Sequence, residues 1–336
     1  MQTDNLIPTW LKKDNDKRLD NYKRDSESEF FLYSFNNILE AFEKEIETPN
    51  NEMFPFLYVV GVPRAGKTLF SQVLSHGLQV GYIDKIISKF WKAPCYGINL
   101  SKILRDREEA LDYISDYGKT KGMYGPHDFS YFWHTWLKMN DVKYNPNEAN
   151  KNIDWIGFSD ELRRISASYD LPGVFKSPNP TYHIERISSV YKKTMWLHIE
   201  RDYIDSAVSL LKGRRDNFGD VKEWYGQYPY PYEHLLNLPY AEQIVRQLND
   251  LTKMYNKQFE RIDPKQVVRV SYSSLCNSPK DTLQKIIKAT EEFTGYSIRY
   301  NCDIPEKFDQ SSHDKDSPDY LMFQQAFDKL NIPKRF

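Results

Sequence analysis

The sequence predicts an α/β fold in three layers, with a central parallel β-sheet flanked by helices on both faces. Three observations predict it. Apolar runs rich in β-branched and aromatic residues recur along the 336-residue chain, and helical patterns separate them. The first run leads through a glycine-containing turn into a helix, which is typical of a buried parallel strand. The expected strands are at 56–62, 173–176, 194–200 and 266–272.

The elements between these strands follow from periodicity and from Gly and Pro signals. Apolar spacing of 3.6 residues predicts the helices, and a Ser-Pro start with Gly295 after the end frames the last of them. An aromatic, loop-rich insertion on the substrate side is expected at 118–158, and a Tyr- and Pro-rich candidate lid at 213–239. The expected helices are at 29–47, 68–78, 101–117, 203–212, 240–261 and 278–295.

Three segments are expected from these patterns. A polar arm and helix should occupy 1–53, the main domain 54–300, and a tail packing on that domain 301–336.

Composition argues against several classes of protein. The formal net charge is −1, so no basic field points to nucleic acid or to an anionic membrane. No apolar stretch is long enough for a secretory leader or a membrane span, which predicts a cytosolic protein. The three cysteines are far apart, with neither metal-site nor disulfide spacing, and no metal site is expected. Nothing indicates the oligomeric state.

The segment GVPRAGKT, residues 61–68, fits the phosphate-loop pattern G-x-x-x-x-G-K-[ST] without a mismatch. In such a loop, successive backbone N–H groups and the N-terminus of the next helix face a phosphate. Gly61 and Gly66 allow the backbone to approach closely, while Arg64 and Lys67 add positive charge. The sequence therefore predicts a P-loop-type fold that binds a phosphate-bearing nucleotide.

The end of the third strand bears on which nucleotide binds. An ATPase wants a carboxylate at the end of an apolar strand to hold magnesium. Here the strand ends in Glu200-Arg201-Asp202, and the arginine suits a second phosphate better than a magnesium ion. Ser209 follows two helical turns later, so Arg201 and Ser209 can converge on one phosphate.

Four segments together resemble the sulfotransferases, over about residues 54–295. GVPRAGKT resembles their 5′-phosphosulfate loop, and LHIERDYIDSAVSLL their 3′-phosphate segment. VFKSP resembles their strand-end lysine, and the segment from 268 to 295 their late strand and helix. Lys67 departs from the family, which more often has a hydroxyl residue there, and the late basic, glycine-containing loop of the cytosolic branch is missing. The chain is therefore most similar to bacterial-type and other divergent members.

The resemblance implies 3′-phosphoadenosine 5′-phosphosulfate as donor, adenosine 3′,5′-bisphosphate as product, and no need for a metal. The expected donor-binding residues are Arg64, Ala65, Gly66, Lys67, Thr68, Leu69, Arg201, Ser209 and Tyr272. Arg64 and the strand-end Lys176 should also act on the transferring group.

A base must take the proton of the acceptor, and histidine is the default candidate. Pro178 stands where the cytosolic branch has its histidine, so the base must come from elsewhere. The resemblance to bacterial-type members, in which a His-acidic pair recurs after Gly-Pro, implies that His127 is the base. Asp128 could orient the imidazole or act itself, and His134 is a weaker choice. The alternative is that His127 only caps the helix starting near Phe129.

The expected acceptor is a small molecule with a hydroxyl or amine, such as a natural product. Sulfotransferases that tailor toxins such as saxitoxin resemble chains of this size. Two alternatives stay open: a P-loop kinase of small molecules that uses ATP and magnesium, and a non-catalytic nucleotide-binding protein. The expected acceptor pocket consists of Tyr124, Phe132, Trp133 and Trp136.

Overall fold

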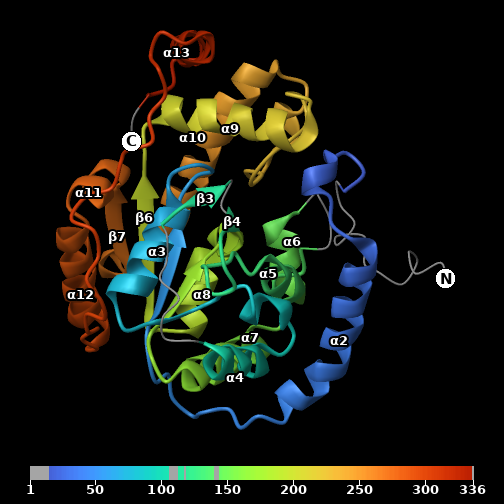
Figure 1. The fold of residues 1–336 in the computed structure, drawn as a ribbon, viewed down its shortest axis with the longest axis vertical. Helices are drawn as coiled ribbons and strands as arrows, with labels where there is room; N and C mark the ends of the chain where they lie inside the picture. The colour runs from blue at the N-terminus through green and yellow to red at the C-terminus, as the bar shows by residue number, and fades with distance from the viewer. Residues whose placement is uncertain (1–14, 106–112, 117–118, 140–143, 335–336) are drawn as a thin grey trace.

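The computed structural model describes residues 15–105, 113–116, 119–139 and 144–334 (Figure 1). A five-stranded sheet forms the centre, and every pairing in it is parallel. Its strand order is β2 (Gly81–Tyr82), β5 (Gly173–Lys176), β1 (Phe56–Val60), β6 (Thr194–Glu200) and β7 (Val267–Ser271). The expected α/β class and the four predicted strands are confirmed. A separate antiparallel pair joins β3 (Ser115–Asp116) to β4 (Lys119–Thr120).

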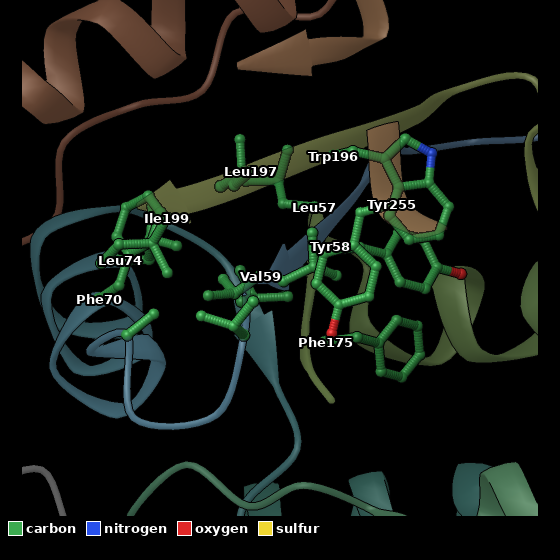
Figure 2. Packing of buried hydrophobic residues seen from close by; sticks show 14 of the residues in the cluster. Leu57, Tyr58, Val59, Phe70, Leu74, Phe175, Trp196, Leu197, Ile199 and Tyr255 are labelled. Carbon is green, nitrogen blue, oxygen red and sulfur yellow. The ribbon is translucent and has the colours of Figure 1, made fainter. Parts of the chain in front are cut away.

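The two faces of the sheet carry different side chains (Figure 2). On one face, Val59 and Ile199 lie with Phe70 and Leu74 of α3, the helix that follows β1. On the other face the packing is aromatic. Tyr58 stacks on Trp196 of β6 with ring centroids 4.6 Å apart, and its ring lies 5.4 Å from that of Phe175 in β5. Full burial of each such side chain contributes about 1.5–3 kcal/mol, so this packing fixes the central strands.

Helices cover both faces of the sheet (Figure 1). On the aliphatic face α3 packs on β1 and β5, and α12 packs on β7. On the aromatic face α10 brings Tyr255 against His198 of β6, with ring centroids 6.0 Å apart. The helices are α2 (Ser26–Lys44), α3 (Lys67–Gly77), α4 (Pro94–Leu104), α5 (Ser130–Trp136), α6 (Pro146–Asn152), α7 (Trp155–Tyr169), α8 (Ile184–Val190), α9 (Tyr203–Phe218), α10 (Tyr240–Phe259), α11 (Tyr272–Asn277), α12 (Pro279–Thr294) and α13 (Pro318–Lys329).

Two predicted segments differ from the structure. The helix expected at 101–117 is wrong, because α4 starts at Pro94 and ends at Leu104, where Arg105 turns to an extended conformation. Residues 106–112 of that prediction lie outside the described residues. The insertion at 118–158 is less loop-rich than expected, since it holds α5, α6 and the start of α7.

The start of the predicted lid also shifts. Helix α9 runs on to Phe218, so the candidate lid starts at Gly219, whose φ of 69° ends the helix. The tail predicted at 301–336 contains α13. The three-segment division remains a prediction. Among the described helices, none has the length and apolar character to cross a bilayer.

Candidate functional site

The carboxyl ends of β1, β5 and β6 meet at one edge of the sheet. The loop 61–68 follows β1, Lys176 ends β5, and Arg201 follows β6. Together they line a cavity of about 310 Å³, here called the loop cavity. Of the predicted donor-binding residues, those lining it are Arg64, Gly66, Lys67, Thr68, Leu69, Arg201, Ser209 and Tyr272. Ala65 is fully buried beneath the loop instead.

Unusual backbone angles shape the loop. Gly66, which caps α3, has a φ of 101°, and a Cβ there would lie 2.5 Å from the Tyr272 ring. Only glycine fits both the angle and the space. Arg64 has a φ of 67°, which is uncommon for a residue with a side chain. It donates from Nε to Ser209 Oγ at 2.8 Å, so its guanidinium lies beside the second turn of α9.

Arg201 forms the second half of this cationic cluster. One of its nitrogens donates to the backbone oxygen of Arg64 at 3.0 Å, and another donates to the oxygen of Ser311. Its guanidinium carbon lies 4.7 Å from the centroid of the Tyr272 ring. Two arginines and the hydroxyl of Ser209 thus share one wall of the loop cavity, an arrangement suited to a phosphate.

Two lysines lie at the other side. The Lys67 ammonium donates to the backbone oxygens of Gly61 at 2.7 Å and Val62 at 2.8 Å. Burial, together with the positive charges of Lys176 and Arg64, lowers the pKa of Lys67 to about 7, against the opposing effect of Asp128. The buried Lys176 pairs with Asp128 at 2.7 Å, joining β5 to the segment that precedes α5.

A backbone hydrogen bond between distant segments places His127 and Asp128. The N–H of His127 donates to the oxygen of Ile83, just past edge strand β2, at 2.8 Å. Phe129 follows with a φ of 52°, and its N–H donates to His127 Nδ1 at 3.1 Å. Since this bond uses the Nδ1 lone pair, a neutral His127 ring carries its proton on Nε2. The ring thus binds the backbone just before α5, and the idea that His127 serves only as a helix cap remains a prediction.

The protonation of this pair is set by its surroundings. Burial lowers the pKa of His127 to about 4, with further lowering by Lys176, Lys89 and Lys85 and opposition from Asp128. Burial acts to raise the pKa of Asp128, but the charge and hydrogen bond of Lys176 outweigh it and the pKa lies below its ordinary value. At neutral pH, His127 is therefore neutral and Asp128 is a carboxylate.

A second cavity, of about 490 Å³, lies on the far side of Asp128. Asp128 lines both this second cavity and the loop cavity, so its carboxylate stands where they meet. His127 lines the second cavity only. The opposite walls come from residues before and within α2 and from residues after β2.

The predicted acceptor residues do not line either cavity. Phe132 and Trp133 are fully buried and pack against Phe175 of β5. Trp136 packs on Phe132, and Tyr124 donates to a backbone oxygen of α4. His134 is also outside both linings.

Sequence reasoning missed several lining residues. Tyr225, Gly226 and Gln227, from the segment expected to form a lid, line the loop cavity, and so does Ser311 from the tail. The Tyr- and Gly-rich composition of the lid could have indicated the first three. No pattern marks Ser311, which reaches the site because its backbone binds Arg201 and the Tyr272 hydroxyl.

The acidic residues around the end of β6 are engaged in structural contacts. Glu200 accepts from Arg269 at 2.6 Å, and Asp202 caps α9 by accepting from Ile204 N at 2.9 Å. Over the described ranges of the chain, no three His, Cys, Asp or Glu side chains cluster in a way that could hold a metal ion.

The chain was compared with protein-family models, with curated proteins and with solved structures. The family model described as the sulfotransferase family matches residues 55–293. No curated protein matches the chain significantly. Among solved structures, a sulfotransferase from Mycobacterium avium is 12% identical, with a TM-score of 0.48, covering 91% of this chain and 74% of that one. Another, from Mycobacterium tuberculosis H37Rv, is 11% identical, with a TM-score of 0.47, covering 78% and 72%.

Proposed function

This chain belongs to the sulfotransferase family, and on that premise we propose that it uses 3′-phosphoadenosine 5′-phosphosulfate to sulfate a hydroxyl or amine of a small molecule. One observation carries the proposal. The loop cavity contains two separate anion-binding arrangements, the loop before α3 and the Arg64–Arg201–Ser209 cluster. A donor with phosphates at both its 5′ and 3′ positions matches both arrangements.

The residues fit this donor. The N–H groups at the start of α3, with Lys67 and Lys176, would hold the phosphosulfate. Arg201 and Ser209 would hold the 3′-phosphate through charge-assisted hydrogen bonds. When bound, the donor supplies an activated sulfuryl group. The lysine charges then stabilise the negative charge that builds on the leaving group, as fixed cations do in phosphoryl transfer.

Geometry favours Asp128 over His127 for the base. Asp128 supports this role because its carboxylate is ionised and lines both cavities, between the donor and the space for an acceptor. His127 uses its only free lone pair for the N–H of Phe129. We therefore propose that Asp128 accepts the acceptor's proton, while Nε2–H of His127 donates a hydrogen bond to the acceptor.

Binding of nucleotides tests the proposal. At a hundred times its dissociation constant, a ligand adds about 2.7 kcal/mol of stability, which thermal melting resolves readily. Adenosine 3′,5′-bisphosphate should raise the melting temperature well above the effect of ATP with magnesium. A kinase retains one supporting feature, the match of Lys67 to the ATP-binding pattern. Stabilisation by ATP with magnesium and none by the bisphosphate would favour that kinase and overturn the proposal.

For the acceptor, the proposal goes no further than a small molecule. A saxitoxin-type acceptor carries two guanidinium groups. The walls of the second cavity are cationic too, so they would repel such an acceptor. A cytosolic location likewise remains a prediction from the sequence.

A further inference from the structure

The second cavity has a pronounced charge imbalance. Five cationic side chains line it, against the carboxylates of Glu29 and Asp128. One of the five, Lys23, pairs with Asp20 at 2.8 Å, which reduces its contribution. The remaining cations come from two separate parts of the chain, so the charge does not belong to one helix face. These four cations are Arg18, Arg24, Lys85 and Lys89.

Each of the two carboxylates has a partner among the described residues. Asp128 pairs with Lys176, which lines the loop cavity. Glu29 accepts from the Tyr131 hydroxyl at 2.7 Å, and that hydroxyl accepts from Arg24 at 3.0 Å. The ammonium of Lys89 has no hydrogen bond or ion pair with the described part of the chain, although its residue lines the cavity.

Two buried donors add to this environment. The indole N–H of Trp91 and the hydroxyl of Thr120 lie in the cavity lining, and neither has a hydrogen-bond partner within the described residues. Both side chains are almost fully buried, Trp91 at 0% and Thr120 at 5% exposure. An unpaired buried donor costs about 1–3 kcal/mol, and both of these atoms lie beneath the cavity surface.

The cationic residues and the proposed base share the lining of this cavity. Lys85, Lys89 and Asp128 all line it, and the charges of the two lysines contribute to the lowered pKa of His127. A molecule that fills this cavity can therefore contact these lysines and place a hydroxyl at Asp128.

We propose that the second cavity is the acceptor site and that it selects acceptors bearing an oxyanion, such as a carboxylate, held by Lys85, Lys89 and Arg24. The proposal rests on the proposed sulfuryl transfer. Under it, the enzyme sulfates small hydroxy acids, with the acid group at the lysines and the hydroxyl at Asp128. The reacting hydroxyl loses its proton to Asp128 and gains the sulfuryl group from the donor, whose bridging oxygen leaves with the nucleotide.

Matched pairs of acids and amides test this selection. The protein is first saturated with adenosine 3′,5′-bisphosphate, so that the probes cannot occupy the loop cavity. Calorimetry then compares 4-hydroxyphenylacetate, 4-hydroxybenzoate and 3-hydroxybutyrate with their neutral carboxamides. At least one acid should bind at least about tenfold more tightly than its amide, equal to about 1.4 kcal/mol. Equal binding within every pair, or no binding of any acid, overturns the proposal.

A variant and a control locate the effect. Lys89→Gln should remove most of the preference for the acid, whereas Lys44→Gln, which makes the same charge change on an exposed part of α2, should keep it. Loss of the preference in both variants would indicate a general surface effect and overturn the assignment.

Proton NMR of the His127 ring gives an independent readout. A bound carboxylate should raise the pKa of the ring, while the amide should not. If the protein does not bind adenosine 3′,5′-bisphosphate at all, the proposed function is wrong. Retained bisphosphate binding without any preference for acids would reject only the acceptor class.

Discussion

At the scale of single residues, Arg201 and Ser209 distinguish the possible nucleotides. Each substitution, Arg201→Ala or Ser209→Ala, should weaken adenosine 3′,5′-bisphosphate binding by about 1.5–3 kcal/mol, because each removes a charge-assisted bond to the 3′-phosphate. ATP lacks that phosphate, so its affinity should change little. Calorimetry with both nucleotides measures this. Arg215→Ala is the control. Arg215 lies in α9 and pairs with Asp319 at the surface, so its substitution also removes one positive charge but should leave both affinities intact.

Substitutions of Asp128 and His127 distinguish the two candidate bases. Asp128→Asn should lower turnover about 10²–10⁴-fold, because the amide cannot accept the proton. Its affinity for adenosine 3′,5′-bisphosphate should hold or increase, since Lys176 loses its counter-charge. His127→Ala should cost less. Release of labelled sulfate from the donor to water gives the turnover. A larger loss for His127→Ala than for Asp128→Asn would make the imidazole the base, as the sequence suggested.

Lys67 should couple donor binding to pH. Its pKa of about 7 in the free protein will rise when anionic groups bind beside it. Below pH 7 the ammonium is charged before and after binding. Above pH 7 binding takes up a proton, so affinity for adenosine 3′,5′-bisphosphate should fall, approaching tenfold per pH unit. Calorimetry in HEPES and Tris measures the uptake. Lys67→Gln cannot titrate there and should bind weakly with a flatter profile, whereas a flat profile for the unaltered protein would contradict this.

At the scale of elements, α2 shows what periodicity does not reveal. Its helical spacing predicted a helix correctly, yet the residues it buries most deeply are Asn36 and Glu43, while Phe31, Ile38 and Phe42 are exposed. Asn36 donates to the backbone oxygen of Lys89, and Glu43 accepts from Cys95 N at 3.0 Å. Polar contacts to the segments after β2, together with the packing of Phe35 on Phe90, therefore hold α2 beside the second cavity.

The contact of α2 with α7 should make stability depend on pH. Burial raises the pKa of Glu161 in α7 to about 8, with a further contribution from Glu43, and Arg164 opposes this only in part. The Glu161 carboxyl of the folded protein therefore stays protonated up to about pH 8, whereas in the unfolded chain it loses its proton above about pH 4.5. This stabilisation is complete below about pH 4.5 and is lost as the pH rises through about 8.

Glu161→Gln tests this dependence, because a glutamine amide can donate to Glu43 at any pH. The variant should gain melting temperature relative to the unaltered protein at pH 8.5, by at least about 2 °C, and gain less at pH 5. Glu148→Gln, at an exposed position paired with Lys151, should show no such pH-dependent gain. A constant difference between Glu161→Gln and the unaltered protein at both pH values would contradict the shared proton.

At the scale of the whole molecule, parallel-sheet logic explains which parts of the site were predictable. Strands of continuous apolar character were recognised, and their carboxyl ends meet at one edge, so the loop 61–68, Lys176 and Arg201 were expected together. Strand β2 has only two residues and no pattern. Yet the backbone of Ile83 beside it anchors the segment carrying Asp128. Such non-local hydrogen bonds leave no trace in periodicity, so the second cavity could not be predicted.

The distribution of charge over the whole site leads to a prediction about metal. Four cations and one carboxylate, that of Asp128, line the loop cavity. Two of the cations belong to the loop 61–68, and the other two lie at or just after the ends of neighbouring strands. A sulfuryl group carries less charge than a phosphoryl group, so these fixed cations can stabilise its transfer without a divalent ion. Turnover of 3′-phosphoadenosine 5′-phosphosulfate should therefore persist in excess EDTA and change little when magnesium is restored. The same assay with ATP supplies the control, because a kinase would lose its turnover to EDTA and regain it with magnesium. A strict magnesium requirement for sulfuryl transfer would mean that Arg64, Lys67, Lys176 and Arg201 do not supply the charge that the reaction needs.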